Sequence, residues 1–204
     1  NPGYLWIFTD KEQLDHSFRT GMPPENKQHP EFRLKRVIRN SGKIFEYTLK
    51  RRGQQGGIIN DDLFLGHDFE GENVAFRHYS SSKQSQSDVL TKTVRGLLDE
   101  GYRPRDIAVL FSKGDVIPTN LSFGFHCPIG TAKENSSCKL VVSTVNKYSG
   151  LDRPVVVLVD VECSVPYGRI LHSFQYSAQT RAMVKLVIIR CEICRKKVKD
   201  QKNR

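Results

Sequence analysis

Short, unbroken apolar runs recur along this 204-residue sequence and set the strongest constraint on its fold. PVVVLVD (154–160) and KLVIIRC (185–191) offer no polar face, so a strand made from either run must be buried on both sides. Sheets with two buried faces are typically parallel and covered by helices. We expect further strands at 4–10, 73–79, 106–112 and 139–145.

Helical patterns alternate with these strands. Residues 85–102 (SQSDVLTKTVRGLLDEGY) place apolar side chains at helical spacing, opened by a Ser/Asp cap and closed by Gly101. Residues 33–52 begin as a short strand and continue as a helix, whereas 53–72 show little periodicity and read as a loop or small insertion. The alternation predicts a three-layer α/β fold, with a mostly parallel sheet covered by helices on both faces.

Basic residues outnumber acidic ones, 32 to 22, which gives a net charge of +10. Much of the positive charge lies in two blocks, 33–52 and 185–204. Such blocks are either solvated surface or the contact for a polyanion, of which nucleic acid is the commonest. Charge alone leaves both interpretations open.

The cysteines and the hydropathy exclude several classes. Five cysteines are an odd number, which favours free thiols in a reducing compartment, and no secretory signal is apparent at the start. The pair Cys191 and Cys194 stands alone, without a second pair at zinc-site spacing, so no metal site is expected. No apolar run reaches the length of a membrane span. We therefore expect an intracellular protein, nuclear or cytoplasmic, that has no membrane partner.

Ligands of open α/β sheets bind at the carboxyl ends of the strands, so the residues just past each apolar run are the first candidates for a site. Arg39, Arg181 and the Ser149-Gly150 turn are expected at one sheet edge, where guanidinium groups suit a phosphate-bearing ligand. A P-loop is absent, because Ile44 follows Gly42-Lys43 and Val37 stands where its first glycine belongs. Asp160 is interpreted as a strand-end residue.

Five stretches, in order, resemble the motifs of the second RecA-like lobe of UvrD-type superfamily 1 helicases, and most closely the carboxyl-terminal helicase region of the longer Schlafen proteins. They are GYLWIFTDKEQ (3–13, motif III), LKRVIRNSGKI (34–44, motif IV), GYRPRDIAVLFS (101–112), STVNKYSGLD (143–152, motif V) and YSAQTRAMVKLVII (176–189, motif VI).

This resemblance implies roles for particular residues. It places Arg39, Arg181 and Gln13 at the γ-phosphate of ATP as the catalytic group, and it places the Gly150-Leu151-Asp152 turn against the nucleotide. It places Ser143, Thr144 and Asn146 beside the backbone of single-stranded nucleic acid, DNA or RNA. The P-loop and the Mg²⁺ site would belong to the missing first lobe, a partner within the full-length chain.

The sequence departs from the commoner motif V in three places. Asn146 stands where His is usual, Ser149 where Lys is usual, and Asp152 where Glu is usual. The change to Ser149 removes a charge that could touch phosphate. The shorter acid at 152 reaches about one methylene less far.

The resemblance also divides the chain. Residues 1–18 would end the first lobe, 19–32 link the lobes, 33–192 form the second lobe, and 193–204 form a basic tail. As a lobe without a P-loop, the fragment alone should not hydrolyse ATP. Two alternatives stay open: an ATPase-dead scaffold that binds nucleic acid for an RNA-cleaving Schlafen-like protein, and a protein-interaction domain whose basic surface binds an acidic partner.

Overall fold

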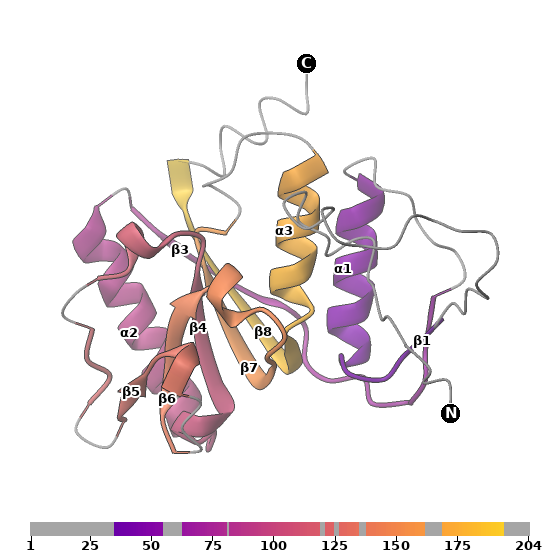
Figure 1. The fold of residues 1–204 in the computed structure, drawn as a ribbon. Coiled ribbons are helices and arrows are strands. Elements are labelled where there is room, and N and C mark those ends of the chain that lie inside the picture. The colour runs from indigo at the N-terminus through magenta and orange to yellow at the C-terminus, as the bar shows by residue number, and fades with distance from the viewer. Residues whose placement is uncertain are drawn as a thin grey trace, which may run out of the picture.

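The computed structural model describes residues 35–54, 63–80, 82–118, 121–124, 127–134, 138–161 and 169–193. Within these residues, six parallel strands form one sheet in the order β3-β8-β7-β4-β6-β5 (Figure 1). The strands are β3 (Ala75–Tyr79), β4 (Ile107–Phe111), β5 (Ile129–Gly130), β6 (Leu140–Thr144), β7 (Arg153–Val159) and β8 (Ala182–Cys191). The expected strand at 4–10, Gln13, the linker 19–32 and all but the first residue of the tail 193–204 lie outside the described residues.

Helices cover both faces of this sheet, as the apolar runs predicted. Figure 1 shows α2 (Lys83–Asp99) on one face, and α1 (Gly42–Gln54) and α3 (Arg169–Gln179) on the other. Alternate residues of β7 supply the two cores: Val155, Val157 and Val159 pack on the α2 side, and Val156 and Leu158 on the α1 and α3 side. Burying each such side chain stabilises the fold by about 1.5–3 kcal/mol. Because β7 contributes side chains to both cores, it is a main source of that stability.

The helix α2 follows its sequence signals closely. Ser82 is its N-cap, and the Ser82 hydroxyl accepts a hydrogen bond from Ser85 N at 3.1 Å. Leu90, Val94 and Leu97 are buried along its inner face. Past its last turn Gly101 has a φ of +96°, a left-handed conformation that favours glycine. None of the helices in the described ranges is long and apolar enough to cross a membrane.

The interpretation of 53–72 as a loop is wrong in part. The helix α1 continues to Gln54, and β2 (Phe64–Leu65) pairs in parallel with β1 (Arg36–Val37) to make a separate two-stranded sheet. The Arg36 guanidinium lies 5.6 Å from the centre of the Phe64 ring, which helps to hold the short strands together. Two-residue strands are too short for an alternating pattern, so no local pattern predicts β2.

The helix α3 and the edge strand β5 are also absent from the sequence-based expectation. On α3 the buried positions include Gln175 and Gln179, which hides the apolar periodicity that usually reveals a helix. β8 begins at Ala182, three residues before the apolar run that predicted it. Its Lys185 binds Glu100 and Glu72, with N–O distances of 2.6 and 2.7 Å, and so ties β8 to the end of α2 and to the segment before β3.

Candidate functional site

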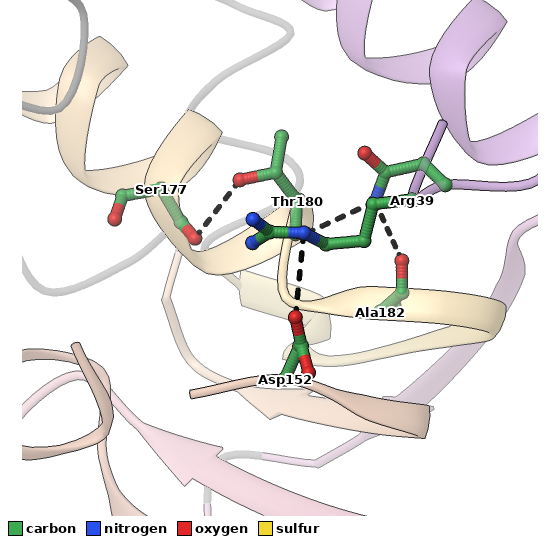
Figure 2. A network of polar contacts seen from close by, with 6 residues as sticks. Arg39, Asp152, Ser177, Thr180 and Ala182 are labelled. Atoms are coloured by element: carbon green, nitrogen blue, oxygen red, sulfur yellow. Dashed lines mark hydrogen bonds and ion pairs between the residues drawn. The ribbon is translucent and has the colours of Figure 1, made fainter. Parts of the chain in front are cut away.

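Three segments that are distant in sequence meet at the amino ends of β7 and β8 (Figure 2). They are the loop after β1, which carries Arg39, the turn before β7, which carries Asp152, and the turn from α3 into β8, which carries Arg181. The sequence predicts that Arg39, Arg181 and the Gly150 turn lie at one edge of the sheet, and in the structure they do. The expected edge was wrong for the turn and for Arg181, because both precede their strands and therefore lie at the amino edge.

Arg39 and Asp152 form the exposed part of this edge. Arg39 Nε lies 3.3 Å from Asp152 Oδ2, and the two side chains are 47% and 40% exposed (Figure 2). An ion pair so open to water stabilises a fold by about 0–1 kcal/mol. The pair therefore contributes little to folding, and the Arg39 guanidinium faces solvent as a cation.

Arg181 lies deeper. It is 4% exposed, and its Nη2 donates to Ser177 Oγ at 3.4 Å. Its backbone N–H donates to Ala178 O at 3.3 Å, and its carbonyl accepts from Arg153 N at 3.2 Å. The backbone of Arg181 is thus held both by the end of α3 and by the start of β7.

Asn40 joins the loop after β1 to the turn that carries Arg181. It is buried, and its Nδ2 lies 3.0 Å from Thr180 O and 2.6 Å from Ala182 O. The next residue continues the contact, since Ser41 N donates to Met183 O at 2.8 Å. Sequence reasoning missed Asn40, because a lone asparagine after an arginine carries no sign of partners so far along the chain.

The turn before β7 is held in place by the contacts of Leu151. Gly150 has a φ of +82°, and a Cβ placed there would meet no other atom within 4 Å, so the backbone conformation and not crowding calls for glycine. Leu151 N donates to Tyr148 O at 3.2 Å, and the Leu151 side chain packs on the α1 and α3 core. The turn is therefore fixed at Leu151, while the partly exposed Asp152 side chain extends to Arg39.

Tyr148 brings a hydroxyl to the same edge. Its side chain is fully buried, and this burial raises the pKa of Tyr148 to about 12. A hydrogen bond with the Arg153 side chain and the positive charge of Arg181 oppose the rise, and Asp152 adds to it. The phenol therefore stays neutral at physiological pH among the charged groups of the edge.

The residues expected to contact nucleic acid lie at the opposite edge. Ser143 and Thr144 end β6, and both are buried. Thr144 Oγ1 accepts a hydrogen bond from Lys147 N at 3.3 Å, and Asn146 and Lys147 are exposed. Because β6 and β7 are parallel, residues 145–152 must cross from the carboxyl edge to the amino edge, which separates Ser143, Thr144 and Asn146 from the Gly150–Asp152 turn.

Asp160 also lies at the carboxyl edge, where it serves a buried network. Asp160 Oδ2 accepts hydrogen bonds from the Tyr79 hydroxyl and from Gln86 Nε2. Burial raises the pKa of Asp160, and the two hydrogen bonds oppose that rise. No three His, Cys, Asp or Glu side chains gather as metal ligands within the described residues.

No protein-family model matches the sequence. Among solved structures, the fold is similar to the C-terminal domain of a possible DNA helicase from Lactobacillus plantarum WCFS1. The TM-score is 0.55, and the match covers 76% of this chain and 88% of that domain. The chain therefore shares the α/β fold of that domain. At 11% identity the match shows the fold alone, so residue roles must come from the geometry of the site.

The predicted α/β fold is thus confirmed, and the predicted site residues fall into two groups. Arg39, Asp152 and Arg181 come together with the Gly150-Leu151 turn, whereas Ser143, Thr144 and Asn146 lie at the other edge. The sequence did not reveal Asn40, Tyr148 or Arg153, which hold the first group in place. Their contacts join separate elements, and the short motifs do not record such contacts.

Proposed function

We propose that this chain is the second RecA-like lobe of a superfamily 1 helicase of the Schlafen-like type. Its amino edge completes an ATP site whose other half belongs to a first lobe of the full-length protein. The observation that carries the proposal is the meeting of Arg39, Arg181 and the Gly150–Asp152 turn at one edge of a helicase-like fold. Gln13 is the third catalytic residue of the proposal and lies outside the described residues.

The chemistry of this edge suits an anionic ligand that carries phosphate groups. Arg39 is a half-exposed guanidinium, whose fork of donors matches two phosphate oxygens. The Gly150 turn leaves open space where a side chain would otherwise stand. ATP with Mg²⁺ would supply the phosphoanhydride bond, and the first lobe would supply the P-loop and the metal ligands.

The two arginines would act differently. Arg39 is accessible and would bind and orient the phosphate chain. Arg181 is buried at the same edge, where its charge is less screened by water, and it would offset negative charge that develops on the γ-phosphate. Arginines in that role are worth about 10³- to 10⁵-fold in rate.

The carboxyl edge would face single-stranded nucleic acid. Asn146 and Lys147 are its exposed polar groups next to β6, and the buried Ser143 and Thr144 fix the segment that presents them. The chain's net charge of +10 supports a polyanionic partner. Residues 145–152 would then link the nucleic-acid edge to the nucleotide edge, as coupling between the two ligands requires.

A second candidate function is an ATPase-dead scaffold that positions nucleic acid for an RNA-cleaving domain. The observation in its favour is that Arg39 already pairs with Asp152, at 3.3 Å. In addition, Ser149 precedes Gly150, where the resembled motif commonly has a lysine. A phosphate would have to compete with the Asp152 carboxylate.

Steady-state ATPase of the full-length protein with single-stranded nucleic acid present separates the two functions. For a working half-site, Arg181→Ala should lower kcat by about 10³-fold, while KM changes little, because the lost interaction belongs to the transition state. Arg181→Lys should restore little of the rate, since an ammonium lacks the guanidinium fork. Arg95→Ala, on the exposed face of α2, is the matched control, and melting curves report folding. Wild-type turnover in Arg181→Ala would exclude Arg181 from the ATP site, whereas a wild-type protein without ATPase would leave the scaffold as the function.

A further inference from the structure

We infer that Asn40 is a positioning residue that sets Arg39 and Arg181 in register at the amino edge of the sheet. The inference rests on the proposed function for its purpose, and on the contacts of Asn40 for its geometry. Asn40 does not itself face the nucleotide, because it is 5% exposed.

The Asn40 amide reaches both sides of Arg181. Its Nδ2 lies 3.0 Å from the carbonyl oxygen of Thr180 and 2.6 Å from that of Ala182. Both partners are acceptors, so only the two N–H bonds of the amide can satisfy them. The side chain of a single residue thereby holds the backbone immediately before and immediately after the buried arginine.

The backbone of Arg181 is therefore fixed from four directions. Its N–H binds Ala178 O, its carbonyl binds Arg153 N, and the carbonyls on either side of it bind Asn40. The partners come from α3, from β7 and from the loop after β1. A backbone held in this way fixes the direction of the Cα–Cβ bond, from which the Arg181 side chain extends.

An irregularity in β8 leaves backbone carbonyls free to accept hydrogen bonds from the loop after β1. The pairing of β7 with β8 shifts between Arg153 and Val155, where Pro154 has no N–H to donate. Opposite this break, the carbonyls of Met183 and Val184 accept from Ser41 N and Ser41 Oγ, at 2.8 and 3.3 Å. Asn40 and Ser41 thus occupy the break in the ladder as a continuous contact.

The same contact fixes Arg39. Arg39 directly precedes Asn40, and its Nε reaches Asp152, the residue before Arg153, at 3.3 Å. The three segments therefore form a closed ring: Asn40 binds the Arg181 turn, that turn binds Arg153, and Asp152, which precedes Arg153, contacts Arg39. Removing the Asn40 amide opens the ring at its buried side.

The geometric test needs no nucleotide. In the 204-residue chain with ¹⁵N-labelled arginine, Asn40→Asp replaces the donor by an oxygen of the same shape, so the Nε–Hε signal of Arg181 and the amide signal of Arg153 should shift. Ser41→Ala, which removes only the longer 3.3 Å contact and keeps the backbone bond, should leave both signals in place. If Asn40→Asp does not fold, Asn40→Ser keeps one donor and is measured instead. Unmoved Arg181 and Arg153 signals in a folded variant overturn the inference, whether or not the protein hydrolyses ATP.

The functional test is a double-mutant cycle in the full-length protein. Asn40→Asp should lower kcat by up to about 10²-fold, the loss that misplacing a catalytic group by about 1 Å brings, with a smaller change in KM. Added to Arg181→Ala, it should lower kcat by much less than it does alone, since it acts in large part through Arg181. An additive loss, or wild-type turnover in Asn40→Asp beside an impaired Arg181→Ala, overturns the positioning role while the proposed function stands. If Arg181→Ala itself keeps wild-type turnover, the proposed function fails and the arginine signals alone decide the geometry.

Discussion

The Tyr79 hydroxyl at the end of β3 donates a hydrogen bond to the Asp160 carboxylate at the end of β7, across the intervening strand β8. Gln86 of α2 donates to the same oxygen. Asp160 holds these contacts with a φ of +54°, in the left-handed region that residues other than glycine seldom adopt. A buried polar network therefore closes the carboxyl edge at some conformational cost.

The first prediction concerns Asp160 and pH. Because its folded-state pKa is raised by burial, its stabilising contribution is present at low pH and is lost as pH rises from its unfolded pKa, near 3.8, through the folded value. Asp160→Asn cannot ionise, keeps an oxygen acceptor and tolerates a positive φ. Its free energy of unfolding, from urea titrations at several pH values, should therefore vary less with pH above 4 than that of the wild type. The same slope in both proteins would contradict this assignment.

The second prediction concerns Lys185. Burial lowers the pKa of Lys185, but hydrogen bonds and attraction from Glu100 and Glu72 outweigh this and leave that pKa raised. Lys185→Met leaves two half-exposed carboxylates that water can solvate, so it should cost little. Glu72→Gln with Glu100→Gln leaves a buried cation without its counter-charges, which should cost about 3 kcal/mol or more. Urea unfolding of both variants checks the order, and the reverse order would refute it.

The third prediction concerns Asp152. Asp152→Asn removes the carboxylate that competes with phosphate for Arg39. Stability should change by less than about 1 kcal/mol, because the pair is exposed. The KM for ATP in the full-length protein should fall, since the phosphates no longer meet a negative charge at this edge. In the control, Arg39→Ala combined with Asp152→Asn, the KM for ATP should no longer fall. An unchanged KM in Asp152→Asn would place the nucleotide elsewhere.

The fourth prediction concerns nucleic acid. The 204-residue chain should bind a labelled single-stranded oligonucleotide with an affinity that falls steeply as salt rises. Lys147→Ala should reduce the slope of log K against log salt by about 0.7, the share of one phosphate contact on a single strand. Arg95→Ala, on the outer face of α2, should leave the slope unchanged. An unaltered slope for Lys147→Ala would remove this residue from the proposed interface.

Local sequence could predict the elements whose buried residues form runs of consecutive apolar side chains. β4, β7 and β8 are apolar throughout their centres, so their two-faced burial follows from composition. α3 hides buried glutamines among its positions, and β2 is only two residues long, so neither carries a local pattern. In the candidate site, Arg39 and Arg181 could be singled out from the sequence, but the Asn40 contacts join residues whose nearness depends on the whole sheet.

The position of β8 bears on how this chain is synthesised. Among the described residues, β8 comes last in sequence, yet it lies between β3 and β7 in the sheet. While the chain emerges from the ribosome, β3 lacks its partner β8 until β4, β5, β6 and β7 have been made, and the carbonyls that Asn40 holds do not yet exist. The nascent chain must therefore keep the edge of β3 that faces β8 from aggregating until β8 arrives. A product cut short before Ala182 would remain in that state, which makes it a substrate for chaperones and proteases.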